Sequence, residues 1–400
     1  MLKNAFIPFG AYWSTPFCKW QGNYANLHAM KFAAEIAQKA LAQRKIDPAN
    51  FDGIYLGLTI PQPCCFYGAP WVAGMLGAPG IAGPVIGQAC ATSATSIGLA
   101  GKDIETGSSK ATICIMCDRT SNGPHLYYPN PFGPGATGDS EDWVWHNFGH
   151  DPFANNSMIQ TAENVAKEAG IKREEQEETA LLRHNQYQDA LKDDCAFQKR
   201  YMVTPVEVRD PSGRKVLATV KSDEGVFPTT REGLAKLKPV LEGGTITFGC
   251  QTYPADGNCG MVVCTREKAR ELSKDKKVEV QLVSYAPART KKGFMAAAVV
   301  PAARLALQRA GIAVKDLKAV KTHNPFAVND IYMSREMDIP VAGMNNYGSS
   351  IIWGHPQAPT GMRATIELIE ELALVGGGYG LFAGCAAGDS AAALVVKVSV

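Results

Sequence analysis

Hydrophobic positions in the first 120 residues alternate between helical and strand-like spacing. Residues 27–45 predict an amphipathic helix, because Phe32, Ile36 and Leu41 recur on one face while charged side chains occupy the other. Short apolar runs predict strands at Phe51–Gly57, Pro84–Ile86 and Ala111–Cys117, with a short helix at Trp71–Leu76. Helices and strands that alternate in this way are typical of an α/β fold, in which crossover helices connect the strands of a sheet.

One long stretch within this region carries no charge. Gly53 to Gly101 contains no Asp, Glu, Lys, Arg or His, although charged residues make up 20% of the chain. Such a run predicts a buried position. Pro and Gly interrupt it too often for a membrane-spanning helix. Within it, Val85–Gly101 predicts a strand end, a tight turn at Gly87 and a buried helix of small residues.

Cys90 lies at the mouth of this helix. Unpaired backbone N–H groups and the positive end of the helix dipole meet there, and both lower the pKa of a thiol toward neutrality. Packing as a small apolar residue is the alternative role for a buried cysteine. Cys90 is therefore a candidate nucleophile, and the choice between the two roles depends on residues further along the chain.

The regular alternation breaks after Asp118. Residues 121–244 begin rich in Pro and aromatic side chains and then become charged, with amphipathic helices expected at Ala162–Ala169 and Arg173–Leu191. An insertion of this size in an α/β unit usually covers a site. The strand pattern resumes at two places, Thr245–Phe248 and Gly260–Cys264.

The second half of the chain echoes the first. At one fixed offset Ala37, Leu41, Ile46 and Phe51 reappear as Ala303, Leu307, Ile312 and Leu317. A helix is expected at Ala364–Leu374, and final strands are expected at Gly380–Phe382 and Ala391–Val400. The chain thus divides into a first half of residues 1–120 with 245–272, an inserted domain of residues 121–244, and a second half of residues 273–400.

Composition limits the partners and the compartment. The formal net charge is +2 with no basic block, so neither nucleic acid nor an anionic membrane is expected as a partner. The eleven cysteines are scattered, and the first residues do not form a secretory signal, which indicates reduced thiols and a cytoplasmic location. Cys114 and Cys117 lie three apart in a strand and face opposite sides, so no metal is expected in this chain.

Three later segments carry reactive side chains in glycine-rich surroundings. His323 lies at the end of the echoed strand, His355 lies between Gly354 and Pro356, and Cys385 lies between Gly384 and Ala386 at the end of a short strand. Each of these residues alone fits a structural role. Together with Cys90 they supply a nucleophile, a base, an oxyanion donor and a second acid or base. That set suits thiolate chemistry on a carbonyl group.

Four motifs in this order resemble the thiolase family over essentially the whole chain. They are Cys90-Ala-Thr-Ser, His323-Asn-Pro-Phe, Gly354-His355-Pro356 with Thr360-Gly-x-Arg363, and Cys385-Ala-Ala-Gly. The histidine box is similar to that of the sterol-carrier-protein-type thiolases. Two departures are the missing Ser-Gly after Cys90 and the altered glycines after Cys385. The resemblance implies an α/β fold of five αβαβα layers from two βαβαβαββ halves, with an inserted loop domain that holds coenzyme A.

The resemblance also implies a mechanism. His355 would deprotonate Cys90, whose sulfur attacks a 3-oxoacyl-CoA, and Cys385 would protonate the departing enolate. Coenzyme A, a substrate here, would then resolve the acyl-enzyme. His323 and His355 would donate to one thioester oxygen, and the backbone N–H groups of Cys90 and Ala387 would donate to the other.

Two further positions and several partners follow from the same resemblance. Thr252 is expected against the pantetheine arm, and Met158 is expected near the acyl pocket. Thiolases form homodimers or tetramers. Some with a histidine at the position of His323 work with a small OB-fold, zinc-ribbon subunit, which is a further expected partner.

The substrate and two other classes of function stay open at this stage. The aromatic start of the insertion suggests a bulky or aromatic acyl group, and the motif wording is similar to benzoylsuccinyl-CoA thiolase, which would place the chain in β-oxidation or aromatic degradation. An acetoacetyl-CoA-type condensing thiolase or a ketosynthase is the enzymatic alternative, and Cys385 argues against the ketosynthase. The altered glycines keep open a non-catalytic thiolase-fold binding or structural subunit.

Overall fold

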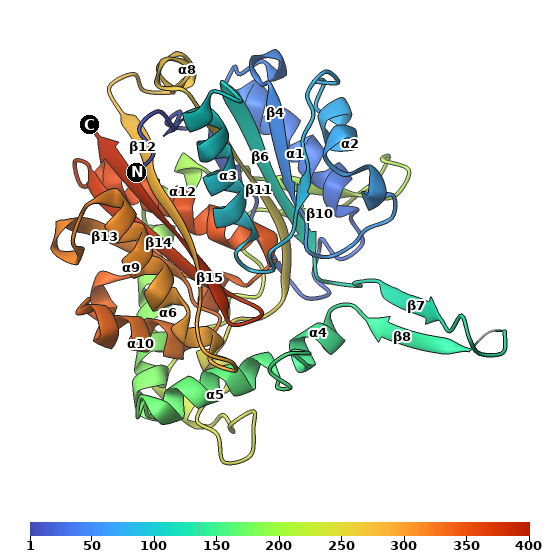
Figure 1. Cartoon of the computed structure of the whole chain (residues 1–400), viewed down its shortest axis with the longest axis vertical. Helices are drawn as coiled ribbons and strands as arrows, with labels where there is room; N and C mark the ends of the chain where they lie inside the picture. The colour runs from blue at the N-terminus through green and yellow to red at the C-terminus, as the bar shows by residue number, and fades with distance from the viewer. Residues whose placement is uncertain (136) are drawn as a thin grey trace.

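The computed structural model describes residues 1–135 and 137–400. A large mixed β-sheet, whose strands are hydrogen-bonded in one continuous order, forms the body of the protein (Figure 1). The order is β13-β14-β15-β12-β1-β11-β6-β4-β5, with β2 and β3 also paired to β11. The bounds are β1 Phe6–Ile7, β2 Tyr12–Ser14, β3 Cys18–Lys19, β4 Gly53–Gly57, β5 Val85–Ile86, β6 Ala111–Arg119, β11 Ala255–Cys264, β12 Glu279–Arg289, β13 Leu317–His323, β14 Gly378–Ala386 and β15 Ser390–Ser399. The sheet has two parts: β11, β6, β4 and β5 form the first, and β12, β15, β14 and β13 form the second. β1 joins them, because Phe6 pairs with both Cys264 of β11 and Gln281 of β12.

Two helices lie between these two parts of the sheet. α3 (Thr92–Thr106) and α12 (Ala358–Leu374) pack on each other, and each contacts strands of both parts. α3 can approach closely because Gly98 and Gly101 leave no room for a Cβ atom against Tyr285 and Leu282. The small residues of α3 therefore allow close packing at the centre of the molecule, as expected for the predicted buried helix.

Further helices cover the outer faces. α1 (Ala29–Gln43) and α2 (Gly68–Met75) cover the first part of the sheet, and α9 (Val299–Ala310), with α10 (Ala327–Met337) beside it, covers the second. The layers are therefore helix, sheet, helix, sheet and helix, which confirms the predicted αβαβα thiolase fold. The remaining helices of the body are α8 Arg266–Leu272 and α11 Ser350–Trp353, and the 3₁₀ turns along the chain are Pro48–Asn50, Cys65–Tyr67, Gln198–Arg200, Phe248–Cys250, Met295–Ala297, Val314–Asp316 and Val341–Gly343.

The inserted region carries two hairpins and four helices among its described residues. Their bounds are β7 His125–Pro129, β8 Gly138–Asp142, α4 Trp145–Gly149, α5 Met158–Glu168, α6 Arg173–Cys195, β9 Val206–Arg209, β10 Val216–Val220 and α7 Arg231–Ala235. The β7–β8 hairpin projects from the body (Figure 1). The backbone leaves helical geometry at Lys192, so the regular part of α6 ends where the sequence predicted.

Buried ion pairs tie the insertion to the second half. The Arg183 guanidinium on α6 lies 2.9 Å from the Asp330 carboxylate on α10. Arg363 on α12 makes two bonds to Asp223 of the insertion, at 2.6 and 2.8 Å. The division of the chain into residues 1–120 with 245–272, 121–244 and 273–400 stays a prediction.

Two expectations about local structure are wrong. Thr245–Phe248 is not a strand, because the Glu163 carboxylate accepts the backbone N–H groups of Thr245 and Ile246, each at 2.8 Å, and a 3₁₀ turn follows. The uncharged stretch is also not buried throughout, since Phe66 is 93% exposed and Tyr67 is 66% exposed. Lack of charge therefore identified the central helix but not the loop before it.

Across residues 1–135 and 137–400, no helix combines the length and the apolar character needed to cross a membrane.

Candidate active site

Cys90 lies in the turn that connects β5 to α3. Ala89, just before it, has φ +43°, a left-handed conformation that is uncommon for a residue with a Cβ atom. The turn is closed by a bond from Ala91 N–H to the Gln88 carbonyl at 3.0 Å. α3 begins only at Thr92, so Cys90 lies two residues outside the helix rather than in its first turn.

His355 faces the thiol directly. Its Nε2 lies 3.0 Å from Cys90 Sγ, and its Nδ1 lies 2.6 Å from Thr360 Oγ1. With the ring proton on Nδ1, the imidazole donates to Thr360 and Nε2 accepts the proton of the thiol. The loop before α12 thus holds a base in position against the predicted nucleophile.

Burial keeps this pair neutral at rest. It raises the pKa of Cys90 to about 12, although the backbone N–H groups of Cys90 and Ala387 act in the opposite direction. Burial also lowers the pKa of His355 to about 3. The expectation of a lowered thiol pKa is therefore wrong, since α3 starts too late and desolvation outweighs the nearby N–H groups.

His323 lies behind this pair at the end of β13. Its side chain is fully buried, Nδ1 lies 3.0 Å from Ser350 Oγ, and Nε2 has no hydrogen-bond partner. Its ring stacks on that of His355, with centroids 4.1 Å apart and planes at 29°. Burial, reinforced by His355, holds the pKa of His323 well below its usual value, so this ring is neutral too.

Cys385 approaches from the neighbouring strand β14. Gly384, just before it, is the register partner of His323 in the parallel β13–β14 pair. The Cys385 thiol is fully buried and accepts a hydrogen bond from Asn329 Nδ2 at 3.2 Å. Burial, together with the nearby Cys90, raises its pKa above the ordinary value. The four predicted side chains are thus brought together, although they come from both halves of the chain.

Gln357 is a polar neighbour of the nucleophile that the sequence analysis missed. Its Oε1 lies 3.2 Å from Cys90 Sγ, and the side chain is buried. The residue has φ +59°, so its backbone adopts an uncommon conformation to place the amide there. The available signal was its position, two residues after His355 in the most specific motif.

Asp118 is a second missed residue. Its carboxylate accepts the backbone N–H groups of Thr59, Ile60 and Ala358 at 2.8 to 2.9 Å, and also the Thr59 hydroxyl. Burial nevertheless raises its pKa to about 7. Asp118 ties the start of α12, next to Gln357, to the loop after β4. Its signal was that it is the first charged residue after the buried strand predicted at Ala111–Cys117; in the structure it lies near the end of β6.

A cavity of about 1310 Å³ opens onto the Cys90–His355 pair. Met158, Thr252, Gln357 and Ala387 line it, while the fully buried His323 and Cys385 do not. The Thr252 hydroxyl donates to the Ser350 carbonyl at 2.5 Å. Only Asp151 among the lining residues carries a formal charge. The aromatic lining residues are Trp143, Trp145, Phe148, Phe153, Phe227, Phe248, Tyr253 and Phe326.

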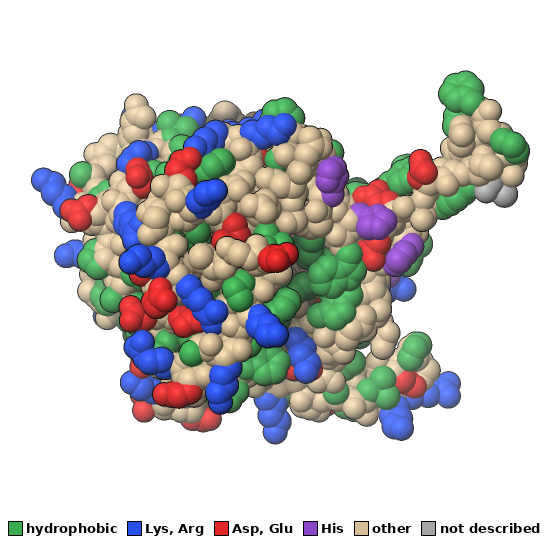
Figure 2. Space-filling model, turned by 90° about the horizontal axis from the view of Figure 1, so that it is seen from below, with side chains coloured by type: hydrophobic (Ala, Val, Ile, Leu, Met, Phe, Trp, Pro, Cys, Tyr) green, Lys and Arg blue, Asp and Glu red, His purple; other side chains and the backbone are tan. Residues whose placement is uncertain are grey.

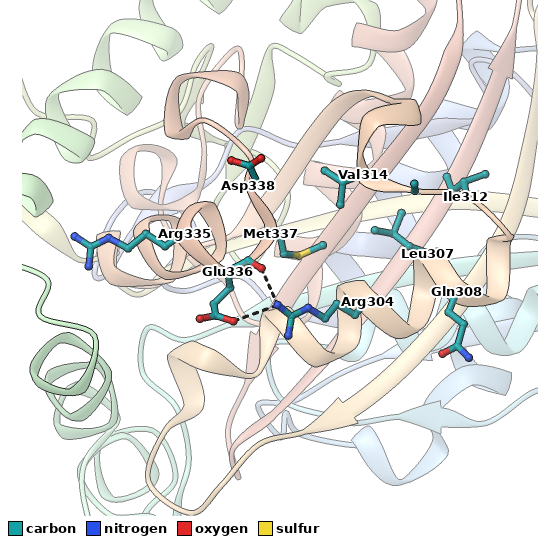
Figure 3. A pocket seen from close by; sticks show the side chains of 10 residues that line it. Arg304, Leu307, Gln308, Ile312, Val314, Arg335, Glu336, Met337 and Asp338 are labelled. Carbon is teal, nitrogen blue, oxygen red and sulfur yellow. Dashed lines mark hydrogen bonds and ion pairs between the residues drawn. The ribbon is translucent and has the colours of Figure 1, made fainter.

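A second, smaller cavity lies apart from this one. Apolar side chains gather beside the base of the projecting hairpin (Figure 2). The second cavity, of about 510 Å³, lies between α9 and α10, where Arg304 is paired with Glu336 (Figure 3). Neither cysteine nor histidine lines that second cavity. The candidate chemistry is therefore in the first.

Comparison with known families decides the relationship. The family profile "Thiolase, N-terminal domain" matches residues 11–267, and "Thiolase, C-terminal domain" matches residues 276–398. The chain belongs to the thiolase family. The predicted family membership is confirmed.

Named relatives of this thiolase span its whole length. It is 30% identical to beta-ketothiolase BktB of Cupriavidus necator over 94% of this chain and 95% of that protein. It is 27% identical to human mitochondrial 3-ketoacyl-CoA thiolase over 99% of both chains. These names are those of acyltransferases, which confirms the predicted enzyme class.

Solved structures agree with this thiolase over nearly every residue. The crystal structure of human mitochondrial 3-ketoacyl-CoA thiolase matches with a TM-score of 0.89 at 26% identity, covering 99% of each chain. The Bacillus anthracis acetyl-CoA acetyltransferase matches with a TM-score of 0.90 at 26% identity, again over 99% of each chain. The human enzyme in complex with CoA matches with a TM-score of 0.88 at 26% identity, covering 99% of this chain and 98% of that one.

Proposed function

We propose that this thiolase cleaves a 3-oxoacyl-CoA with coenzyme A through an acyl group carried on Cys90. The single observation that supports this proposal most strongly is the 3.0 Å contact of Cys90 Sγ with His355 Nε2, beside a large cavity. The names of the relatives, and the human neighbour solved with CoA, support thiolysis and CoA binding.

The first half-reaction moves one proton and breaks one carbon–carbon bond. As His355 Nε2 takes the proton of Cys90, the sulfur attacks the 3-oxo carbon. The bond between C2 and C3 then breaks, C3 stays on sulfur as a thioester, and C2 leaves as the enolate of the shorter acyl-CoA. Cys385 gives its proton to C2. Because the thiol and the imidazole both rest neutral, proton transfer accompanies attack instead of preceding it.

Two sets of donors face the oxygens that become negative. In the tautomer that carries its ring proton on the unpartnered Nε2, His323 can donate to the enolate oxygen together with His355. The N–H groups of Cys90 and Ala387 converge near Cys90 Sγ and serve the tetrahedral oxygen at C3.

The second half-reaction restores the resting site. The Cys385 thiolate takes the proton of coenzyme A, whose sulfur attacks the acyl carbon on Cys90. The bond from that carbon to Cys90 Sγ breaks, and Cys90 recovers its proton from His355. Both cysteines and both histidines return to their neutral state, so the enzyme is unchanged over the cycle.

The acyl group is proposed to be bulky or aromatic, of the benzoylsuccinyl-CoA kind. Aromatic side chains line the cavity beside Cys90, and Met158 and Phe326 are among its lining residues. Rings of this type stack favourably on an aromatic acyl group. Thr252, which lines the same cavity, is proposed to lie against the pantetheine arm.

A panel of 3-oxoacyl-CoAs tests the reaction and the acyl group together. After a brief reaction without coenzyme A, digestion and mass measurement should find the acyl mass on the peptide that holds Cys90, with aromatic substrates labelling fastest. Cys90→Ser should give no thioester label. Acylation of another cysteine would overturn the mechanism, and labelling only by acetoacetyl-CoA would favour the condensing alternative.

The cytoplasmic location, the homodimer or tetramer, and the OB-fold zinc-ribbon subunit stay predictions.

A further inference from the structure

Three possible metal ligands converge at the reacting sulfur. Cys90 Sγ and one ring nitrogen each of His323 and His355 all lie within 4.8 Å of one another. His323 Nε2 is fully buried and has no hydrogen-bond partner. We propose that Cys90, His323 and His355 form a binding site for a thiophilic divalent cation such as Zn²⁺, and that its occupancy reversibly blocks catalysis.

The dimensions suit tetrahedral zinc with one open position. Zinc sites have Zn–S near ~2.3 Å and Zn–N near ~2.0 Å, so neighbouring ligand atoms lie roughly 3.3 to 3.8 Å apart. Cys90 Sγ and His355 Nε2 are 3.0 Å apart. The two distances from the His323 ring nitrogen to these atoms are no longer than 4.8 Å. Shifts of side chains alone, each below about 1 Å, would therefore bring the three atoms onto one sphere.

Both rings are already oriented for this role. Ser350 Oγ holds Nδ1 of His323, and Thr360 Oγ1 holds Nδ1 of His355. Nε2 of His355 is thereby placed against the sulfur, and Nε2 of His323 is left without a partner. A partner on the second ring nitrogen is what fixes metal-binding histidines in known sites. Burial keeps both imidazoles neutral. Metal binding uses the His323 tautomer with its proton on Nδ1, donated to Ser350 Oγ, which leaves the Nε2 lone pair available; Ser350 can accept it because its own proton goes to Asn324 Oδ1.

Occupancy would remove both groups that start the reaction. Zn²⁺ would replace the proton of the Cys90 thiol, which leaves to solvent, and would take the lone pair of His355 Nε2. No electron is transferred in this exchange. Cys90 and His355 line the cavity, so the fourth position would face the side from which a water or a thiol of coenzyme A arrives. Block of catalysis rests on the proposed function, whereas metal binding does not.

Binding is measured on free protein, with no acyl-CoA or coenzyme A present. Titration with Co²⁺, a spectroscopic substitute for Zn²⁺, should give one tightly bound ion per chain and a thiolate-to-cobalt absorption band. Cys90→Ser should lose the band, and His323→Ala should weaken binding at least 10-fold. Cys64→Ser is the matched control, because Cys64 is an exposed thiol next to Cys65 and should leave the band unchanged.

A second readout uses the unaltered protein. Zn²⁺ should protect Cys90 from alkylation by iodoacetamide, as measured on its peptide, and a chelator should restore both alkylation and turnover. A band lost in Cys64→Ser but kept in Cys90→Ser would overturn the site, as would alkylation of Cys90 at an unchanged rate in saturating Zn²⁺. A chain that binds Co²⁺ at this site but cleaves no 3-oxoacyl-CoA would contradict only the proposed function.

Discussion

At the scale of single residues, the resting site is defined by the absence of charge on its two reacting groups. Cys90 and His355 are in contact, yet burial disfavours the thiolate and the imidazolium alike. Bound substrate offers a carbonyl carbon that accepts the sulfur as its proton departs. Reactivity is therefore expected to depend on substrate rather than on a thiolate already present in the free enzyme.

Alkylation of free enzyme tests this neutrality. Because the pKa of Cys90 is raised to about 12, the thiolate fraction should rise about tenfold per pH unit across the alkaline range. Iodoacetamide should therefore label the Cys90 peptide slowly at pH 7, and the rate should still be climbing at pH 10. The exposed Cys64 serves as an internal comparison in the same digest. A rate for Cys90 that is level from pH 7 upward would mean that the thiolate forms at rest.

Gln357→Leu tests the missed neighbour of the nucleophile. The change removes an amide oxygen that accepts from the Cys90 thiol at 3.2 Å and therefore stabilises the protonated sulfur of the resting site. Loss of one neutral hydrogen bond of about 0.5–1.5 kcal/mol from the resting state corresponds to a rise in acylation rate of roughly 2- to 10-fold. Gln357→Glu should instead slow acylation, because a carboxylate beside the sulfur opposes thiolate formation. Gln251→Leu, in the same cavity, is the matched control. Equal rates for all three variants and the parent would show that the contact has no role.

Cys385→Ala separates the thiolase reaction from its rivals. Without this thiol, Cys90 can still be acylated slowly by a saturated acyl-CoA, but the enolate formed from a 3-oxo substrate has no proton donor. Acid–base groups contribute about 100- to 10,000-fold, so cleavage should fall by that much. Asn329→Ala is a milder companion, since Asn329 donates to this sulfur. Cleavage by Cys385→Ala at close to the parental rate would refute the two-cysteine mechanism.

At the scale of elements, the sequence predicted most of the regular structure, and the four candidate residues that it named lie in one region of the fold; their roles stay predictions. Helical spacing located α1 and α5, and small residues located α3, because burial of one face leaves a periodic trace. The contacts of Gln357 and Asp118 could not be predicted, since each reaches a partner more than fifty residues away. The direction of the Cys90 pKa shift also depends on burial, which composition does not give.

Asp118 connects three elements, and its titration should be visible in stability. Its pKa is raised to about 7 from 3.8, so the folded chain holds this proton more tightly than the unfolded chain. The group therefore contributes stability at low pH that is lost as the pH rises through 7, by at most about 1.4 kcal/mol per pH unit. Asp118→Asn should flatten the free energy of unfolding between pH 6 and 7, measured in urea.

Asp256→Asn is the comparison for this slope. Burial raises the pKa of Asp256 to about 6, so its own contribution should be lost mostly below that pH. Both variants should therefore flatten the pH dependence between about pH 4 and 6, whereas the slope between pH 6 and 7 should be flattened mainly by Asp118→Asn. If Asp118→Asn keeps the parental slope between pH 6 and 7, the titrating group is another residue.

At the scale of the whole molecule, buried Arg–Asp ion pairs hold the insertion against the body. Arg363 bonds Asp223 twice, bonds Glu367 at 3.1 Å, and lies over the rings of Phe17 and Trp353. Removing one partner of such a buried pair leaves a charge without compensation. Asp223 therefore has a structural role at the contact between the insertion and the body.

Asp223→Asn should measure that contact. We expect a loss of about 3–5 kcal/mol in the free energy of unfolding, determined in urea. Glu168→Gln is the matched control, because Glu168 pairs with Lys291 between the insertion and the body while both side chains are 55% exposed. That control should lose less than about 1 kcal/mol. Similar losses for the two variants would show that the buried pair is no stronger than a surface pair.

The fixed insertion also determines how a ligand meets the enzyme. Arg183–Asp330 and Arg363–Asp223 fix the insertion, part of which lines the cavity, against the second half of the chain. We therefore expect the cavity to recognise an acyl-CoA without first closing over it. Association should then be a single encounter, with an observed rate that increases in proportion to ligand concentration and does not level off. Selection among acyl chains would fall mainly on how long each one stays bound.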